Sequence, residues 1–208
     1  MDPRIFLYLF TALFLLAEPA LAHHPMGGIS PQNSWQGLLS GIGHPIIGLD
    51  HFAFIILVGL SASYFGKVKS IPLIFICSTV AGCLLKFFGI GLPVAEFVIT
   101  GSVILVGTMI ASGRLFSSNL QCFIFGTTGL FHGWAYGESI LGSELTPMIS
   151  YLIGFGLTQY LVAVGVGFIA IAMWRTHKNH QMLPRLAGAV CLGIGSALFI
   201  EQIEAMVF

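Results

Sequence analysis

Charged side chains are scarce in this chain, which has 208 residues but only 8 Lys or Arg and 8 Asp or Glu. Charged residues make up 8% of the sequence, against about 25% in an ordinary soluble domain. A soluble enzyme of this length needs a more polar surface than these charges supply, and a nucleic-acid-binding protein needs a basic face. Hydrophobic residues reach 56%. The composition therefore indicates an integral membrane protein that does not bind nucleic acid.

Cysteine is also rare, and all four cysteines lie inside apolar stretches of the sequence: Cys77, Cys83, Cys122 and Cys191. This placement indicates small apolar core residues and not the disulfide framework of a small secreted domain. The sequence also lacks the glycine-rich loop with a Lys-Ser or Lys-Thr pair that binds ATP phosphates. Any transport by this chain is therefore expected to run without ATP hydrolysis.

The N-terminus has the layout of a cleavable secretory signal peptide. Arg4 gives a weakly basic start, residues 5–17 carry no charge, and Ala20-Leu21-Ala22 is a small-residue cleavage motif. The apolar run is too short for a comfortable membrane span, although an uncleaved anchor remains the alternative. We therefore predict three parts, namely a signal peptide at 1–22, an external segment at 23–37 and a transmembrane domain at 38–208.

The remainder of the sequence contains six largely apolar stretches separated by polar or breaker-rich connections. Each has the length or the flanks expected of a transmembrane helix: 38–65, 71–85, 97–113, 120–137, 145–174 and 186–200. We predict an all-α integral membrane protein with six transmembrane helices after signal-peptide removal and with both termini outside.

The positions of the charges support this topology independently. Without Arg4, seven of the eight basic residues remain, and six of them fall in the connections 66–69, 112–119 and 175–185. No acidic residue lies in these three connections. Because basic residues concentrate in cytoplasmic loops, these connections are predicted to be cytoplasmic, in a multi-pass protein of the inner (plasma) membrane.

The first predicted span contains ionisable residues, which are costly in a membrane and are functional candidates for that reason. His44, Asp50 and His51 lie in the segment GHPIIGLDH. On a regular helix the two histidines share a face and Asp50 points away from it. Pro45 lacks an N–H and Gly48 is conformationally permissive. Local unwinding at these two residues would turn Asp50 toward the imidazoles.

A second cluster lies in the fourth predicted span, where FHGWAYGE covers residues 131–138 and places His132 six residues before Glu138. Together the two clusters offer three imidazoles and two carboxylates. This donor set suits nickel, cobalt or zinc, whereas magnesium and calcium prefer oxygen ligands throughout. The alternative is that each histidine is a hydrogen-bonded packing residue.

These two motifs resemble those of the HupE/UreJ family. The resemblance implies a six-helix nickel or cobalt permease in which His44, Asp50, His51, His132 and Glu138 handle the metal. Nickel is the first expectation and cobalt the second, each as a transported substrate and not as a permanently bound cofactor. The family commonly has a second histidine where this chain has Tyr136, which leaves one imidazole fewer. His23 and His24 would stand at the new external N-terminus as a weaker metal-capture pair.

The resulting hypothesis is a secondary inward transporter and not an enzyme, with a divalent cation and the lipid bilayer as its partners. A homo-oligomer and an indirect link to assembly of a nickel enzyme remain open. The main alternative is a metal-dependent intramembrane hydrolase that uses the same His, Asp and Glu residues with Ser139. A rhomboid-type serine protease would need a histidine on a late span, and the sixth span has none. A purely structural subunit is the remaining alternative.

Overall fold

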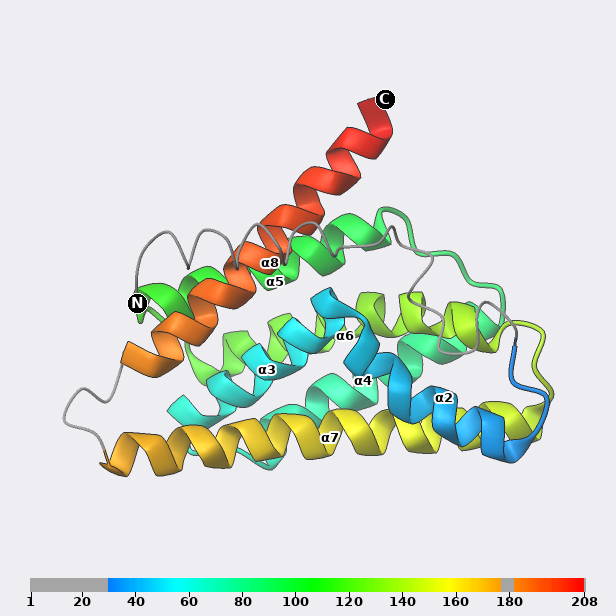
Figure 1. Ribbon diagram of the computed structural model, residues 1–208, viewed down its shortest axis with the longest axis horizontal. Helices are drawn as coiled ribbons and strands as arrows, with labels where there is room; N and C mark the ends of the chain where they lie inside the picture. Colours follow the sequence, from blue (N-terminus) through cyan, green and yellow to red (C-terminus); the bar gives the residue numbers. More distant parts are fainter. Residues whose placement is uncertain (1–29, 177–181, 208) are drawn as a thin grey trace, which may run out of the picture.

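The computed structural model describes residues 30–176 and 182–207, and within these ranges the chain is helical with no strand. The predicted signal peptide and His23 and His24 lie outside these ranges. The elements in chain order, drawn in Figure 1, are α2 (Ser34–Ile47), α3 (Leu49–Tyr64), α4 (Ser70–Phe87), α5 (Ala95–Ser112), α6 (Ser118–Tyr136), the 3-10 turn η2 (Gly137–Ile140), α7 (Leu145–Thr176) and α8 (Met182–Val207).

The first predicted span is two helices and not one, because α2 and α3 meet at Gly48 with a bend of 79°. Gly48 has extended backbone angles, φ −73° and ψ 109°, which end one helix and begin the next. Pro45 lies in the last turn of α2, where its missing N–H weakens the helix. The break therefore occurs where the sequence predicted local unwinding, and it places Asp50 and His51 in the first turn of α3.

Three helix pairs pack closely, α2 with α7, α4 with α6 and α5 with α8, and glycines occupy their contact faces. A Cβ atom on any of these glycines would meet atoms of the facing helix at less than ordinary contact distance. Small residues permit such close approach between helices in a membrane. The glycines are Gly37, Gly41, Gly82, Gly133, Gly107, Gly188 and Gly195.

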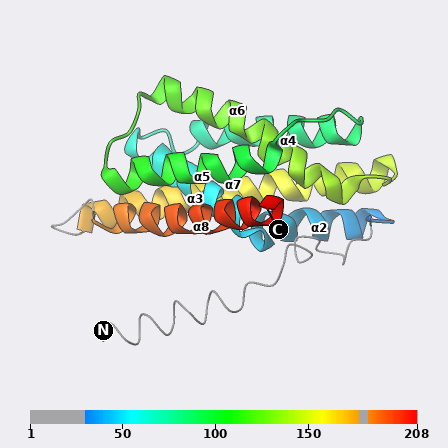
Figure 2. The same ribbon diagram turned by 90° about the horizontal axis from the view of Figure 1, so that it is seen from above.

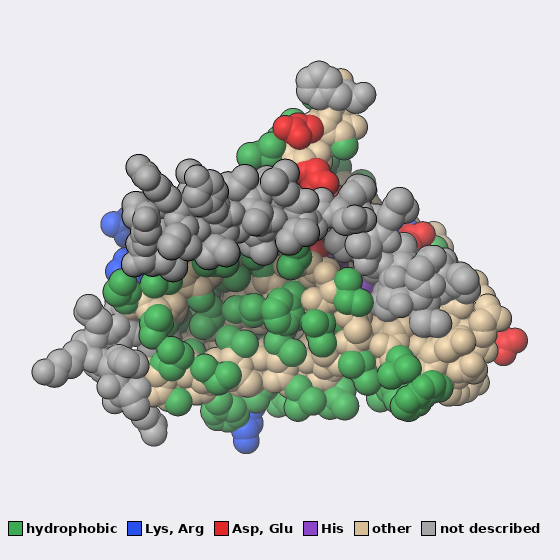
Figure 3. Space-filling model, viewed as in Figure 1, with side chains coloured by type: hydrophobic (Ala, Val, Ile, Leu, Met, Phe, Trp, Pro, Cys, Tyr) green, Lys and Arg blue, Asp and Glu red, His purple; other side chains and the backbone are tan. Residues whose placement is uncertain are grey.

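Helix α3 lies at the centre of the bundle. Twelve of its sixteen residues are buried, and Figure 2 shows α4 and α6 on one side of it and α2 and α8 on the other. Large hydrophobic side chains cover much of the outer surface in Figure 3, as expected of helices that face lipid. The site residues on α3 are therefore enclosed by the other helices.

Four helices, α4, α5, α7 and α8, are long and apolar enough to cross a membrane, and the bent pair α2–α3 makes a fifth span if it crosses as one unit. These helices indicate a multi-pass membrane protein. Helix α6 has 19 residues but does not belong to this set, and its polar residues lower its hydropathy. The described residues thus account for four or five spans, and the sixth remains a prediction.

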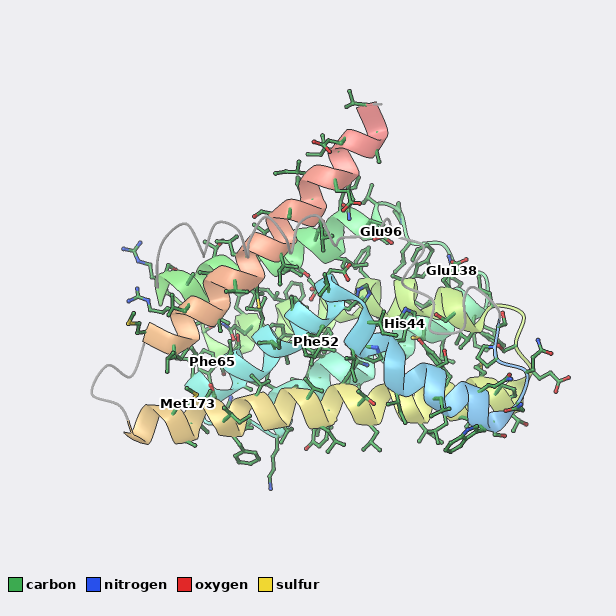
Figure 4. The ribbon with its side chains drawn as sticks, in the orientation of Figure 1. His44, Phe52, Phe65, Glu96, Glu138 and Met173 are labelled. Carbon is green, nitrogen blue, oxygen red and sulfur yellow. The ribbon has the colours of Figure 1, made fainter. Side chains whose placement is uncertain are left out.

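Charge is sorted between the two ends of the bundle. The α3–α4 and α5–α6 connections and the start of α8 meet at one end, where Lys67 Nζ donates to Ser118 Oγ at 2.9 Å and Arg185 Nε donates to Ala111 O at 3.0 Å. In Figure 4, Phe65 and Met173 lie toward this base-rich end, whereas His44 and Glu138 lie toward the other. The assignment of the base-rich end to the cytoplasm remains a prediction.

Candidate functional site

Asp50 and His51 form a buried, hydrogen-bonded pair immediately after the helix break. Asp50 Oδ1 accepts a hydrogen bond from the His51 backbone N at 2.8 Å and lies 2.6 Å from His51 Nδ1. A carboxylate only accepts hydrogen bonds, so Nδ1 carries the proton that faces it. In a neutral imidazole this leaves the lone pair on Nε2, and Nε2 is buried with no hydrogen-bond partner among the described residues.

His132 shows the same arrangement with the two ring nitrogens exchanged. Its Nε2 lies 2.9 Å from Ser102 Oγ on α5, and the Ser102 hydroxyl also donates to Ile99 O at 2.6 Å. Because the hydroxyl has one hydrogen, and Ile99 O takes it, Nε2 of His132 must be the donor to Ser102. The lone pair therefore lies on Nδ1, which is buried and finds no partner within the described part of the chain.

The His51 imidazole lies against that of His132 and against the Tyr136 ring. The His51 and His132 ring centroids are 5.0 Å apart, and the Tyr136 ring centroid is 4.1 Å from that of His51 and 4.7 Å from that of His44. Tyr136 is 1% exposed, and its hydroxyl also lacks a hydrogen-bond partner in residues 30–176 and 182–207. Two imidazole lone pairs and one phenol hydroxyl, all buried and unsatisfied, are thus gathered in one small region.

His44 is held by hydroxyl groups from two other elements. Its Nδ1 lies 2.8 Å from Ser139 Oγ in η2 and 2.9 Å from Tyr151 Oη on α7. Tyr151 in turn donates to the Tyr136 backbone O at 3.2 Å. The Tyr136 ring contacts the imidazoles of both His44 and His51, so it links the α2 and α3 sides of the break.

Glu138 lies apart from the buried groups, although the sequence pattern groups it with His132. Its Oε2 forms an ion pair with Lys86 Nζ at 2.6 Å, and its side chain is 51% exposed. The same ammonium group lies 3.8 Å from the centroid of the Trp134 ring. Helix α6 ends at Tyr136 and the chain tightens into η2, which moves Glu138 off the helical register of His132.

The described residues do not present an assembled metal site, because no group of three or more His, Cys, Asp or Glu among them is placed to hold a metal ion together. Four of the five predicted ligands are buried, namely His44, Asp50, His51 and His132. The assignment of these residues and Glu138 as metal ligands therefore stays a prediction.

Two supporting residues were missed by the sequence analysis, Ser102 beside His132 and Tyr151 beside His44. Each is a hydroxyl side chain in an apolar helix, and each is buried. A hydroxyl that can return its hydrogen to its own helix is common in membrane spans, so its presence alone does not identify a partner. Only the packing of α5 against α6, and of α2 against α7, shows which histidine each one contacts.

Comparison with known proteins agrees with the two motifs. A family model described as HupE / UreJ protein matches residues 11–198. Protein HupE of Rhizobium leguminosarum bv. viciae is 31% identical over 193 residues, which cover 91% of this chain and 96% of that protein. No solved structure matches the chain significantly. The matched region includes the broken helix, both histidine motifs and most of the bundle, and the chain therefore belongs to the HupE/UreJ family.

Proposed function

We propose that this chain carries a divalent transition-metal cation, nickel in the first place and cobalt in the second, inward across the bacterial inner membrane without ATP hydrolysis. One observation carries the proposal. His51 and His132 each have one ring nitrogen anchored to the protein and the other buried and unpaired. Buried polar atoms normally have partners, so unpaired lone pairs on adjacent imidazoles point to a cationic ligand.

The anchoring of each imidazole is the form that metal-binding histidines use. A metal-ligating histidine almost always donates its second N–H to a carboxylate, carbonyl or other acceptor, which fixes the tautomer and aims the lone pair at the ion. Asp50 and Ser102 make these contacts here. In this proposal Asp50 orients His51 as its first role, and its second oxygen remains able to contact the ion.

Tyr136 fills the space beside His44 on α2 and His51 on α3. In this proposal the ion would contact both helices there. The Tyr136 ring packs edge-on against His44 and His51, and its unpaired hydroxyl supplies an oxygen where the family commonly has an imidazole. A change in the Tyr136 side-chain angle would open the space between the imidazoles. Imidazole with a small number of oxygen donors suits nickel, cobalt and zinc better than magnesium or calcium.

The membrane potential supplies enough driving force for inward movement. A divalent cation gains about 4.6 kcal/mol per 100 mV, twice the single-charge value. Glu96 and Glu138 lie away from the base-rich end in Figure 4, and Glu144 immediately precedes α7; these acids would attract the cation. We place the end opposite the base-rich end outside, with His23 and His24 on the same side, and the base-rich end in the cytoplasm.

Uptake of radioactive nickel by cells that lack their own nickel importer tests this function. Cells that produce the wild-type chain are expected to accumulate nickel, and cobalt is expected to compete better than zinc or manganese. His44→Ala and Asp50→Asn should each reduce uptake to the background of cells without the chain, at equal amounts of protein in the membrane. Normal uptake by either variant would contradict the site assignment.

The hydrolase alternative is supported by one contact, the 2.8 Å distance between Ser139 Oγ and His44 Nδ1. In this alternative a bound metal would activate a water molecule beside Ser139 and His44. Asp50 is engaged elsewhere, because it pairs with His51. Metal-dependent hydrolysis of a lipid ester or amide by the purified chain, together with no metal movement into vesicles, would favour this alternative.

A further inference from the structure

Three phenylalanines close the histidine region on the side of the base-rich end. Phe54 on α3, Phe75 on α4 and Phe125 on α6 are each no more than 1% exposed. The Phe54 ring centroid lies 5.3 Å from that of Phe75 and 5.9 Å from that of Phe125. Phe54 also stacks on His132 at 4.4 Å with an interplanar angle of 23°. His132 therefore rests directly on an aromatic layer, which we call the phenylalanine barrier.

Polar side chains reappear on the far side of the phenylalanine barrier. Ser61 lies seven residues after Phe54 on α3, about 10 Å further along the helix axis. Gln121 lies four residues before Phe125 on α6, about 6 Å further toward the same end. Spacings of seven and four keep each residue on the helix face that carries its phenylalanine. Ser61 and Gln121 thus lie beyond Phe54 and Phe125, the two phenylalanines through which α3 and α6 contact each other.

Neither residue is satisfied by the protein. Ser61 is 0% exposed and Gln121 is 1% exposed. Ser61 Oγ and both amide atoms of Gln121 make no hydrogen bond to any described residue. A buried amide with neither its oxygen nor its nitrogen paired lowers stability, and leucine would fill a similar volume without that cost. Such a group in a membrane protein is a functional candidate by default.

We propose that Gln121 and Ser61 form an inner station that receives the divalent cation after it passes the phenylalanine barrier. This inference rests on the proposed transport function. The amide and hydroxyl oxygens bind a nickel or cobalt ion, or its water shell, more weakly than imidazole does. Weak binding at this level favours release, because conduction needs sites that an ion can leave. The base-rich end follows directly, since Lys67 bonds to Ser118 one turn before Gln121.

The test uses the full-length chain, purified and reconstituted in vesicles with an interior-negative potential and nickel outside. Gln121→Leu removes the amide and keeps the side-chain volume. The variant is expected to lower the initial nickel uptake rate by about tenfold or more, since the ion loses its donors beyond the barrier. Its thermal midpoint should equal or exceed that of wild type, because an unpaired buried amide is lost. Nickel affinity, measured with a competing chelator dye, should stay within about twofold, because the histidines are untouched.

Asn119→Leu is the matched control, since Asn119 lies two residues away on α6 and its amide is exposed. Its uptake should equal that of wild type. Wild-type uptake by Gln121→Leu, or an equal loss in Asn119→Leu, would overturn the inner station while leaving the transport function standing. If Gln121→Leu does not reach the membrane, Ser61→Ala decides the question, with reduced uptake expected and wild-type uptake contradicting the proposal. Wild-type protein that moves no nickel would instead refute the proposed function, and the station with it.

Discussion

Gly133→Ala tests whether the close packing of α6 against α4 outweighs the gain in helix propensity that alanine brings. Gly133 follows His132 on α6, and a Cβ atom there would overlap the backbone carbonyl of Thr79 on α4. Gly82 makes the reciprocal approach to Leu130 O. Backbone atoms cannot move aside as the end of a flexible side chain can, so Gly133→Ala must push α4 and α6 apart. The displacement acts on the residue adjacent to the imidazole.

Gly126 is the matched control, because it lies on the same face of α6 two turns earlier. A Cβ atom there would find Ile74 Cγ2 and Ser78 Oγ at 3.8 Å, an ordinary contact distance. Glycine costs about 1 kcal/mol relative to alanine inside a helix, so Gly126→Ala should be neutral or stabilising by up to about that amount. Overpacking costs about 1–3 kcal/mol, which should exceed the propensity gain at Gly133. The propensity gain is the same in both variants, so we expect Gly133→Ala to be about 1–3 kcal/mol less stable than Gly126→Ala.

The assay is the thermal midpoint of each purified variant in detergent, followed by nickel uptake at equal amounts of protein in the membrane. Gly133→Ala should melt below wild type and should lose about tenfold or more in the uptake rate, which corresponds to ~1.4 kcal/mol of activation free energy. Gly126→Ala should retain both properties. Equal midpoints and equal uptake for the two variants would refute the interhelical contact and its effect on His132.

Three further predictions concern the polar groups around the site. Tyr136→Phe keeps the ring contacts and removes the unpaired hydroxyl, so the thermal midpoint should rise or stay constant while the apparent nickel affinity in uptake falls; unchanged affinity would remove the phenol oxygen from the cation's path. Lys86→Met frees the carboxylate of Glu138 at a stability cost below about 1 kcal/mol, because the pair is partly exposed, and cobalt should then compete for nickel uptake at lower concentration; weaker competition would show that the ion pair assists uptake. Nickel uptake should decrease as external pH falls below about 6, because ligand imidazoles must be neutral; uptake that is equal or higher at about pH 5.5 would argue against imidazole ligation.

The class of the fold follows from the sequence because composition alone decides it. Few charges indicate a membrane protein, and long continuous apolar stretches indicate that it spans the membrane with helices. The break at Gly48 was also visible, since Pro45 and Gly48 both weaken a helix. The 79° angle of the bend could not be predicted from the sequence. The angle is set by what the two helices pack against, which is α7 for α2 and the centre of the bundle for α3. The stretch from 38 to 65 is therefore two helices and not one continuous helix, and its crossing of the membrane as one broken span stays a prediction.

The candidate site was predictable where its contacts are local. Asp50 and His51 are neighbours in sequence, and their hydrogen bond needs only the first turn of α3. The contacts of His132 with Ser102 and of Glu138 with Lys86 join different helices, and spacing within one motif carries no information about them. The six-residue separation of His132 and Glu138 suggested a shared site, but η2 and the reach of Lys86 give that carboxylate a different partner.

The most direct test of the account is nickel accumulation by vesicles that contain only the purified chain and lipid. Wild-type protein is compared with a double variant, His51→Gln and His132→Gln, which removes both unpaired imidazole nitrogens. With an interior-negative potential, wild-type vesicles should concentrate radioactive nickel, and double-variant vesicles should match protein-free vesicles. Equal accumulation by the two proteins, or none by wild type, would contradict transport through the buried histidines.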